Sequence, residues 1–354
     1  MVAPDGKTEE ENVVNVIIPV YKARATLCDA FDSLVAQTKK MFIVTCIQDA
    51  DDEDYTDIVE EYRRRGLQIR WLKNEVNMGP GVSRQVGIDS DEMCDRIMFL
   101  DADDMFFPNT IECAYDESKK TDADIIAFNF ICEQTPNPPM LMEVEKIPCT
   151  WNHGKIYKKS YLKSINLRWR DDLRRNEDSY FNLVAWNGTT NKAFVRQPAY
   201  LWRNNQASLT RIEGTEGFFL RGADQYIWSQ VMGMEKLIEL GKLSAPLLAM
   251  TLCNIYDTYM HAVHKKMDLN MMDLYLSRFR ANHAVQTTMQ SPDFWKVTSQ
   301  FVKACDWYDT TLYFYKERFI DWLTRCVRAV GPYAHEMSEE EIKAAQAAQE
   351  GANK

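Results

Sequence analysis

The sequence lacks any apolar run approaching the roughly 20 residues of a membrane-spanning helix, although 45% of its 354 residues are hydrophobic. It also lacks a C-x-x-C pair. Its nine cysteines are scattered from Cys28 to Cys326, which argues against a disulfide framework and a zinc site. The first twelve residues are acidic and polar, unlike a signal peptide. We therefore expect a cytoplasmic protein with reduced thiols and a disordered N-terminal segment, residues 1–12.

Positive charge is scarce in the first part of the chain. Residues 1–150 hold 15 Lys and Arg against 30 Asp and Glu, whereas residues 151–330 hold 25 against 17. The net charge of the second stretch is therefore +8, within a chain whose total is −10. This imbalance indicates an acidic half that could hold a metal ion and a basic half that could hold anions, although single lysines on helix faces also explain the latter.

Short runs rich in Val, Ile and Phe alternate with helix-like stretches in the first 130 residues. The predicted strands cover residues 13–20, 42–47, 67–72, 96–101 and 124–130. The predicted helices cover residues 25–37, 54–65, 80–89 and 108–120. Such alternation predicts an α/β fold with a mostly parallel sheet that helices flank on both faces.

The rest of the chain divides into an irregular part and a helical part. Residues 135–148 are rich in Pro and Met without a period, and we interpret them as a loop or crossover. After about Gly214 only helical patterns remain, over residues 218–240, 245–265, 271–284 and 292–330. The predicted organisation is an α/β domain over 13–213, an all-helical C-terminal domain over 214–332 and a peripheral helix or tail over 333–354.

Three carboxylates follow the predicted core strand Ile97-Met-Phe-Leu100, in Asp101-Ala-Asp103-Asp104. Ligands of open α/β sheets bind beyond the carboxyl ends of the strands. Carboxylates at such an edge suit Mn²⁺ or Mg²⁺, which prefer oxygen ligands and share them with substrate phosphates. The alternative is a solvated acidic turn, and the surrounding sequence decides between the two.

Several further segments occur along the chain in an order that is typical of one enzyme family. They are Val16-Ile-Ile-Pro-Val-Tyr21, Gln48-Asp-Ala-Asp51, Asn77-Met-Gly79, Ser83-Arg-Gln85, Gly154-Lys-Ile-Tyr157, Glu177-Asp-Ser-Tyr-Phe181, Tyr200-Leu-Trp-Arg203 and Ser208-Leu-Thr210. Together with the three carboxylates, they resemble an inverting family 2 glycosyltransferase with the GT-A fold over residues 13–211. The resemblance implies a nucleotide-binding sheet.

The resemblance also implies a site for a nucleoside diphosphate sugar, with UDP as the nucleotide. The matching positions are Pro19, Tyr21, Asp49, Asn77, Gly79, Arg84, Asp101, Arg203, Ser208, Thr210 and Arg211. Because Pro19 cannot donate to a sheet ladder, we expect the chain to leave the sheet there. The sequence departs from the family at Gln48-Asp-Ala-Asp-Asp-Glu-Asp54, where D-D-G-S-x-D is usual, and at Gln85, where asparagine is usual.

The same resemblance assigns the metal and the catalytic base. Asp103 would be the direct ligand of Mn²⁺ or Mg²⁺, with His153 as a further ligand, and Asp178 would be the base that Glu177 positions. A structural histidine is the alternative for His153. For the acidic pair, the alternative is a surface cluster of salt bridges with the neighbouring arginines.

The expected function is metal-dependent transfer of a sugar to an acceptor hydroxyl with inversion. A glycan of the surface-polysaccharide type is the expected acceptor. A hydroxylated base in DNA is an alternative that the +8 charge of residues 151–330 permits. A second alternative is a non-catalytic module that binds a sugar nucleotide or a nucleic acid.

Overall fold

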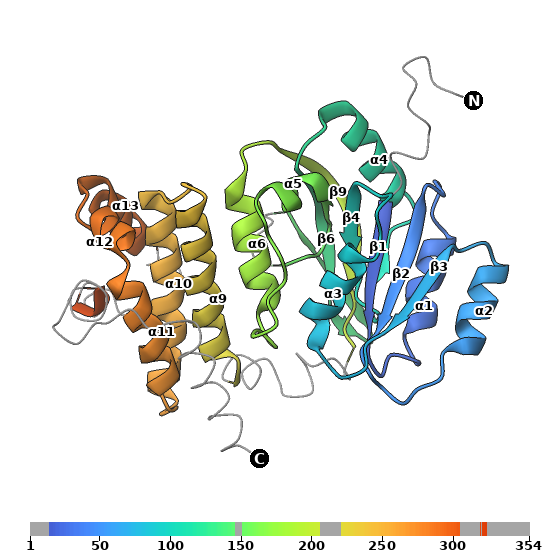
Figure 1. Cartoon of the computed structure of the whole chain (residues 1–354), viewed down its shortest axis with the longest axis horizontal. Helices are drawn as coiled ribbons and strands as arrows, with labels where there is room; N and C mark the ends of the chain where they lie inside the picture. Colours follow the sequence, from blue (N-terminus) through green and yellow to red (C-terminus); the bar gives the residue numbers. More distant parts are fainter. Residues whose placement is uncertain (1–13, 146–150, 206–220, 305–318, 320, 324–354) are drawn as a thin grey trace. The chain divides into compact units, whose positions relative to one another are not determined.

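The computed structural model describes residues 14–145, 151–205, 221–304, 319 and 321–323. The chain divides into two compact units, Met1–Ile212 and Glu213–Lys354. The first unit is an α/β structure and the second is helical (Figure 1). Both predicted classes of structure are therefore confirmed.

The first unit is built on one nine-stranded sheet in the order β3-β2-β1-β4-β8-β6-β9-β5, with β7 paired to β6. Its strands are β1 (Val14–Val20), β2 (Phe42–Gln48), β3 (Ile69–Lys73), β4 (Arg96–Phe99), β5 (Met105–Phe106), β6 (Ile125–Pro136), β7 (Pro139–Val144), β8 (Lys155–Lys158) and β9 (Lys192–Trp202). The pairs among β3, β2, β1 and β4 are parallel, as predicted. The other half is mixed, because β8 runs antiparallel to both of its neighbours while β6 and β9 are parallel.

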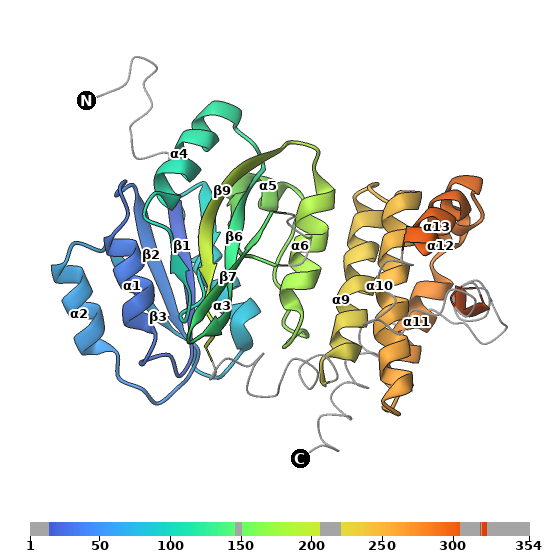
Figure 2. The ribbon, with the colours of Figure 1, turned by 180° about the vertical axis from the view of Figure 1, so that it is seen from behind.

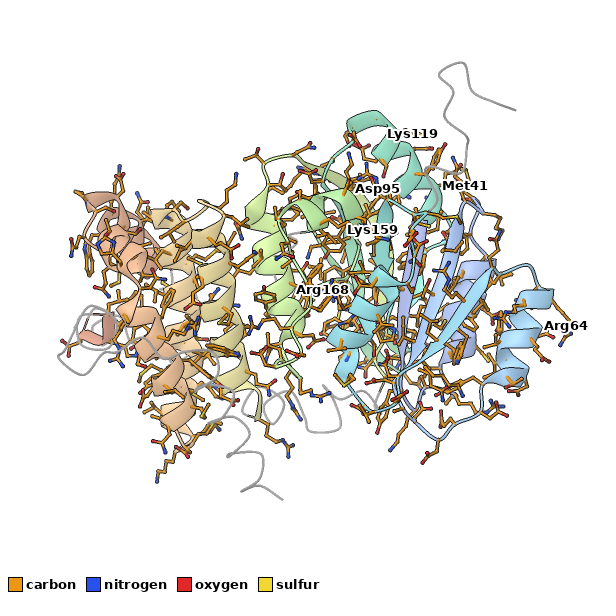
Figure 3. All side chains as sticks on the ribbon, in the orientation of Figure 1. Met41, Arg64, Asp95, Lys119, Lys159 and Arg168 are labelled. Atoms are coloured by element: carbon orange, nitrogen blue, oxygen red, sulfur yellow. The ribbon has the colours of Figure 1, made fainter. Side chains whose placement is uncertain are left out.

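Helices cover both faces of this sheet (Figures 1 and 2). They are α1 (Leu27–Val35), α2 (Thr56–Arg64), α3 (Gly79–Asp89), α4 (Thr110–Thr121), α5 (Lys159–Ser164) and α6 (Glu177–Gly188). Alternate residues of β1 belong to one buried apolar cluster with side chains of α1, α2 and α4. On the other face α3 approaches β1 closely at Gly87, where a Cβ atom would lie 2.5 Å from Cγ2 of Ile17. Charged side chains such as Arg64 on α2 and Lys119 on α4 are exposed (Figure 3).

The described part of the Pro- and Met-rich stretch, residues 135–145, is not a loop, so that prediction was wrong there; residues 146–148 lie outside the described residues. β6 continues to Pro136 and turns into β7, and the two strands pair as an antiparallel hairpin. The turn contains Asn137 and Pro138, and Pro136 and Pro139 stand at the adjoining ends of the two strands. Proline is tolerated at a strand end or an edge strand because no ladder bond is lost there. The residues of β7 before Val144 are exposed, so no period-2 burial pattern marked the strand.

β1 ends at Val20, as the predicted strand 13–20 does, but it continues one residue beyond Pro19, where the chain was expected to leave the sheet. Successive residues of a strand face alternate neighbours. The carbonyl of Ile17 accepts from Leu100 after β4, and the carbonyl of Val20 accepts from Asp49 after β2. Pro19 therefore faces the side where β4 has already ended, and its missing N–H costs no ladder bond.

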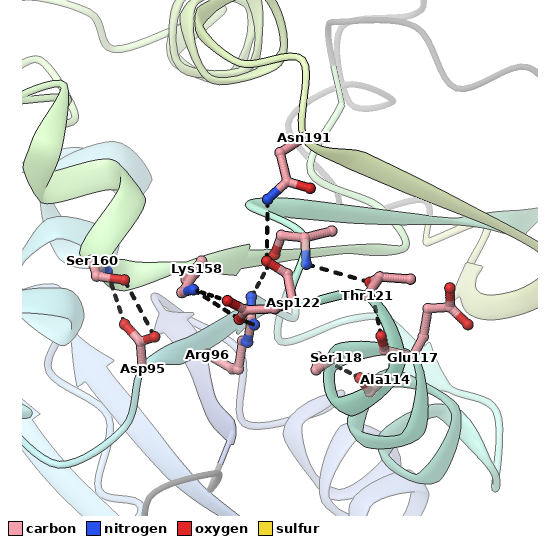
Figure 4. Close-up of polar contacts among 11 residues, drawn as sticks. Asp95, Arg96, Ala114, Glu117, Ser118, Thr121, Asp122, Lys158, Ser160 and Asn191 are labelled. Carbon is pink, nitrogen blue, oxygen red and sulfur yellow. Dashed lines mark hydrogen bonds and ion pairs between the residues drawn. The ribbon is translucent and has the colours of Figure 1, made fainter.

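The amino end of β4 is held by a cluster of ion pairs around Asp122 (Figure 4). Nη2 of Arg96 donates to Oδ1 of Asp122 at 2.7 Å, and Nζ of Lys158 lies 2.7 Å from both carboxylate oxygens. These hydrogen bonds, led by that of Lys158, lower the pKa of Asp122. Arg96 and Lys158 pair across β4 and β8, so the cluster fixes the sheet at the end opposite to the three carboxylates.

The second unit contains α9 (Ala223–Glu239), α10 (Ala245–His264), α11 (Asn270–Ala281), α12 (His283–Met289) and α13 (Pro292–Ala304). The rings of Trp228 and Tyr275 stack at 4.6 Å and lie in its core. The predicted helix over 271–284 ends early, because the Asn282 side chain accepts from the backbone of Ala284 and caps α12. Within the described residues, no helix is both long enough and apolar enough to span a bilayer.

Candidate active site

The three carboxylates lie at the carboxyl edge of the sheet, between β4 and β5. The amide of Asp104 donates to the carbonyl of Asp101 at 3.0 Å, so the segment is a tight turn. Asp104 is buried, whereas Asp101 and Asp103 are partly exposed. Burial and the charges of its two neighbours raise the pKa of Asp104 well above its usual value. The solvated-turn alternative does not fit a buried carboxylate.

The end of β9 fixes the buried carboxylate of Asp104. The hydroxyl of Tyr200 donates to its Oδ2 at 2.6 Å, and the backbone amide of Arg203 donates to its Oδ1 at 2.8 Å. The Tyr200 hydroxyl also accepts from the amide of Asp101 at 3.2 Å. Tyr200 was not among the predicted site residues, although it opens one of the segments that carry the resemblance.

His153 stacks on Tyr200 with ring centroids 4.6 Å apart. Burial lowers the pKa of His153 to about 4, so the imidazole is neutral at pH 7. Its Nδ1 atom is buried and has no hydrogen-bond partner within the described part of the chain. A neutral imidazole with an unused nitrogen is the form that binds a metal ion.

One ligand atom each from Asp101, Asp104 and His153 can be chosen so that the three lie within 4.8 Å of one another. Carboxylate oxygens suit Mn²⁺ and Mg²⁺, and an imidazole is a common ligand of transition-metal ions. The residues present therefore fit a divalent cation. Asp103, the predicted direct ligand, is not a member of this group; its Oδ2 accepts from Nδ2 of Asn205 at 3.0 Å.

Arg84 links this carboxylate turn to the predicted catalytic pair. Its Nη2 lies 2.7 Å from Oδ1 of Asp101, and its Nη1 lies 2.9 Å from Oε1 of Glu177. The guanidinium is buried and lies 5.0 Å from the centroid of the Trp169 ring. Burial opposes its charge, but the two carboxylates raise the pKa of Arg84 overall. This position is buried, unlike that of an arginine in a surface salt bridge.

Replacing Arg84 by methionine would leave Asp101 and Glu177 without their shared cation. Removing one partner of a buried ion pair is expected to lower the free energy of unfolding by about 3 kcal/mol. Urea unfolding measures the change. The matched control is Arg168→Met, because Arg168 pairs with Asp89 at 2.6 Å on the surface (Figure 3) and its loss should cost at most about 1 kcal/mol. Equal losses in the two variants would contradict the expectation.

Asp178 is the second residue of α6, after Asn176 in the left-handed conformation at φ 56°. The residue is partly exposed, whereas its neighbour Glu177 is buried. Burial and the neighbouring charge of Glu177 raise the pKa of Asp178 to about 7, against the opposing effect of Arg84. A carboxylate with such a pKa is suited to general base catalysis near neutral pH.

The predicted nucleotide-binding residues Asp49, Asn77 and Gly79 lie together at the start of α3. Oδ1 of Asp49 accepts from the amide of Met78 at 2.9 Å and Oδ2 accepts from the amide of Gly79 at 2.7 Å. Nδ2 of Asn77 donates to the carbonyl of Asp49 at 3.3 Å. Gly79 has φ 84°, which few other residues adopt. Asp49 therefore caps α3, and its contact with a base stays a prediction.

The remaining predicted residues are more dispersed. Tyr21, after the strand that contains Pro19, exposes 47% of its surface at the carboxyl edge. The guanidinium of Arg203 donates to the carboxylate of Asp29 on α1, so Arg203 already forms an ion pair within the protein. Ser208, Thr210 and Arg211 lie outside the described residues, as do the segments 1–12 and 333–354.

Residues 15–168 match the family model for Glycosyl transferase family 2. Over 222 residues the chain is 25% identical to the Uncharacterized glycosyltransferase EpsJ of Bacillus subtilis, covering 56% of this chain and 63% of the relative. Over 187 residues it is 26% identical to the Poly(ribitol-phosphate) beta-glucosyltransferase of Bacillus spizizenii, covering 49% and 29%. The chain thus spans less than two thirds of the length of either relative.

The structure of S. aureus TarS 1–349 in complex with UDP-GlcNAc superposes with a TM-score of 0.61 at 14% identity. The superposition covers 82% of this chain and 92% of the TarS chain. At this identity the likeness shows the fold alone, and it confirms the predicted GT-A fold.

Proposed function

We propose that this chain, whose residues 15–168 match the Glycosyl transferase family 2 model, transfers a sugar from a nucleoside diphosphate sugar to an acceptor hydroxyl with inversion. The observation that carries this proposal is the Arg84 bridge. It joins the carboxylate turn at Asp101 to the Glu177–Asp178 pair. The residues proposed to bind the donor and those proposed to act as the base therefore belong to one site.

In the proposed reaction Asp178 takes the proton of the acceptor hydroxyl. The acceptor oxygen attacks the anomeric carbon from the face opposite the diphosphate and forms the new glycosidic bond. The bond from the anomeric carbon to the diphosphate oxygen breaks, and its electron pair leaves with the diphosphate. Arg84 holds Glu177 beside Asp178, and that neighbouring charge keeps the base near the pKa that transfer at neutral pH requires.

Asp101, Asp104 and His153 would hold a divalent cation, Mn²⁺ or Mg²⁺, with Asp103 beside them. Such an ion neutralises the charge that develops on a leaving diphosphate. Tyr200 and the amide of Arg203 orient the Asp104 carboxylate for this task. The loop with Ser208, Thr210 and Arg211 supplies further anion donors in the sequence prediction.

The transfer rate is expected to rise with pH until Asp178 is ionised. Because burial raises the pKa of Asp178 to about 7, the carboxyl is protonated below that pH and cannot accept the hydroxyl proton. The value of kcat should therefore fall about tenfold for each pH unit below this pKa. Steady-state kinetics at saturating donor and acceptor measure the profile. A rate that stays flat from about pH 5 to about pH 8 would argue against this role for Asp178.

UDP is the proposed nucleotide and a glycan of the surface-polysaccharide type the proposed acceptor. The UDP-GlcNAc complex of the TarS structure and the poly(ribitol-phosphate) in the name of the B. spizizenii relative support this choice. The distinguishing experiment is a panel of donors screened for binding with and without Mn²⁺, followed by transfer to poly(ribitol phosphate) and to duplex DNA with hydroxymethylated bases.

Mn²⁺-dependent transfer from a UDP-sugar to the glycan polymer would support the proposal. Transfer to DNA, with salt-dependent binding of the duplex, would support the same reaction but show that the acceptor is DNA and not a glycan. Tight donor binding without transfer or donor hydrolysis would favour a non-catalytic binding module.

A further inference from the structure

A group of buried polar side chains lies behind the first turn of α6 and takes no part in the mechanism above. It consists of Asn152, Lys155, Tyr157 and Asn182, which expose 5%, 1%, 0% and 1% of their surface. Buried polar groups cost free energy unless hydrogen bonds compensate them, and a buried ammonium costs the most. The group therefore needs an explanation beyond packing.

The side-chain amide of Asn182 is the centre of this group. Its Oδ1 accepts from the hydroxyl of Tyr157 at 2.6 Å and from Nζ of Lys155 at 3.2 Å. Its Nδ2 donates to Oδ1 of Asn152 at 2.9 Å and to the backbone carbonyl of Asp178 at 3.0 Å. All four hydrogen-bonding positions of the amide are thus used, which fixes its orientation.

These bonds join α6 to the middle of the sheet. Lys155 and Tyr157 belong to β8, which lies between β4 and β6. The apolar contacts of α6, such as Phe181 stacked on Trp169 at 4.2 Å, hold the helix against its neighbours. Dispersion contacts depend weakly on direction, whereas hydrogen bonds are directional, so these bonds are suited to fixing the rotation of the helix about its axis.

We propose that Asn182, held by Lys155 and Tyr157, is a positioning residue that fixes the first turn of α6 and thereby places the carboxylate of Asp178. Asn182 lies one helical turn after Asp178, and its bond to the Asp178 carbonyl is the link between the two. The inference rests on the proposed function, because it takes Asp178 as the base. The proposed donor-binding residues lie on other elements, and among them Arg84 contacts the first turn of α6 through Glu177, so the loss should be much larger in kcat than in donor affinity.

The kinetic test uses two variants and a control. Tyr157→Phe removes one hydrogen bond and keeps the ring, which lies 5.5 Å from Phe181. Asn182→Leu removes the whole link. We expect kcat to fall about 10-fold in the first and about 100-fold in the second, with the donor KM within about twofold of the wild type. The control is Asn187→Leu, because Nδ2 of Asn187 bonds the carbonyl four residues earlier at 2.8 Å in the same helix, without a bond to β8 among the described residues.

Hydrogen exchange gives a readout that does not depend on activity. The backbone amides of residues 179–182 should exchange faster than in the wild type in Tyr157→Phe and Asn182→Leu. Their exchange rates should be unchanged in Asn187→Leu. Unchanged exchange in both test variants, or faster exchange with kcat unchanged in an active enzyme, would overturn the inference. If the wild type transfers no sugar at all, the proposed function fails, and exchange alone decides whether the group fixes the turn. Should Asn182→Leu not fold, Tyr157→Phe carries the test.

Discussion

Replacing Asp178 by asparagine is expected to lower kcat for sugar transfer by about 10³-fold, because an amide cannot accept the proton of the acceptor hydroxyl. The substitution preserves the size of the side chain, so the α6 turn and its bond to Asn182 should persist. Donor affinity should stay close to that of the wild type, since the predicted nucleotide contacts come from other elements. Calorimetric titration of the donor and a transfer assay together measure the two quantities.

The matched control is Glu177→Gln, which changes the adjacent carboxyl in the same way. Glutamine still offers an oxygen to Nη1 of Arg84, so the bridge to Asp101 is partly kept. Because the charge of Glu177 helps raise the pKa of Asp178, its removal should lower that pKa and move the acid limb of the rate profile to lower pH. Near-normal transfer by Asp178→Asn, or an equal loss in both variants, would remove Asp178 as the base.

The sequence pattern was sufficient to predict the elements of the parallel half of the sheet and its helices. Val14–Val20 and Phe42–Gln48 are nearly continuous apolar runs, which is typical of strands buried on both faces. β7 was missed because its side chains are exposed on an edge strand, and such a strand carries no burial pattern. Burial by tertiary neighbours, and not local propensity, marked β1, β2, β3, β4 and β6 in the sequence, whereas β5, β8 and β9 were not predicted as strands.

The candidate site was predictable as a set of residue types but not as a set of contacts. The order of Asp101, Asp103 and the Glu177–Asp178 pair along the chain carried the family resemblance. No periodicity indicates that Arg84 bonds Glu177, which lies 93 positions away, or that Tyr200 bonds Asp104, which lies 96 positions away. Such bonds depend on which sheet edge each segment reaches, and the fold alone specifies that.

Chelation of divalent ions is expected to remove transfer almost entirely, and added Mn²⁺ should restore it. The turn brings the carboxylates of Asp101, Asp103 and Asp104 together. Burial and the charge of Asp101 raise the pKa of Asp103. A bound cation would therefore relieve the repulsion among the three carboxylates. His153→Ala should weaken Mn²⁺ binding at least about 10-fold, because it removes the one nitrogen ligand of the group. Calorimetric titration with MnCl₂ measures this affinity without reference to activity.

Asp103→Asn and Asp104→Asn then decide which acid binds the ion. The geometry favours Asp104, since its carboxylate is held by Tyr200 and by the amide of Arg203 and lies in the group with His153. The sequence resemblance favours Asp103. Replacing a direct ligand should lower the Mn²⁺ affinity at least about 100-fold and replacing its neighbour much less, because the loss of a group that only supports a ligand lowers affinity about 10- to 100-fold. Thermal unfolding of both variants checks that the turn remains folded. Unaltered Mn²⁺ affinity in His153→Ala and in both aspartate variants would show that the ion binds elsewhere, and transfer that persists after chelation would show that the reaction needs no metal.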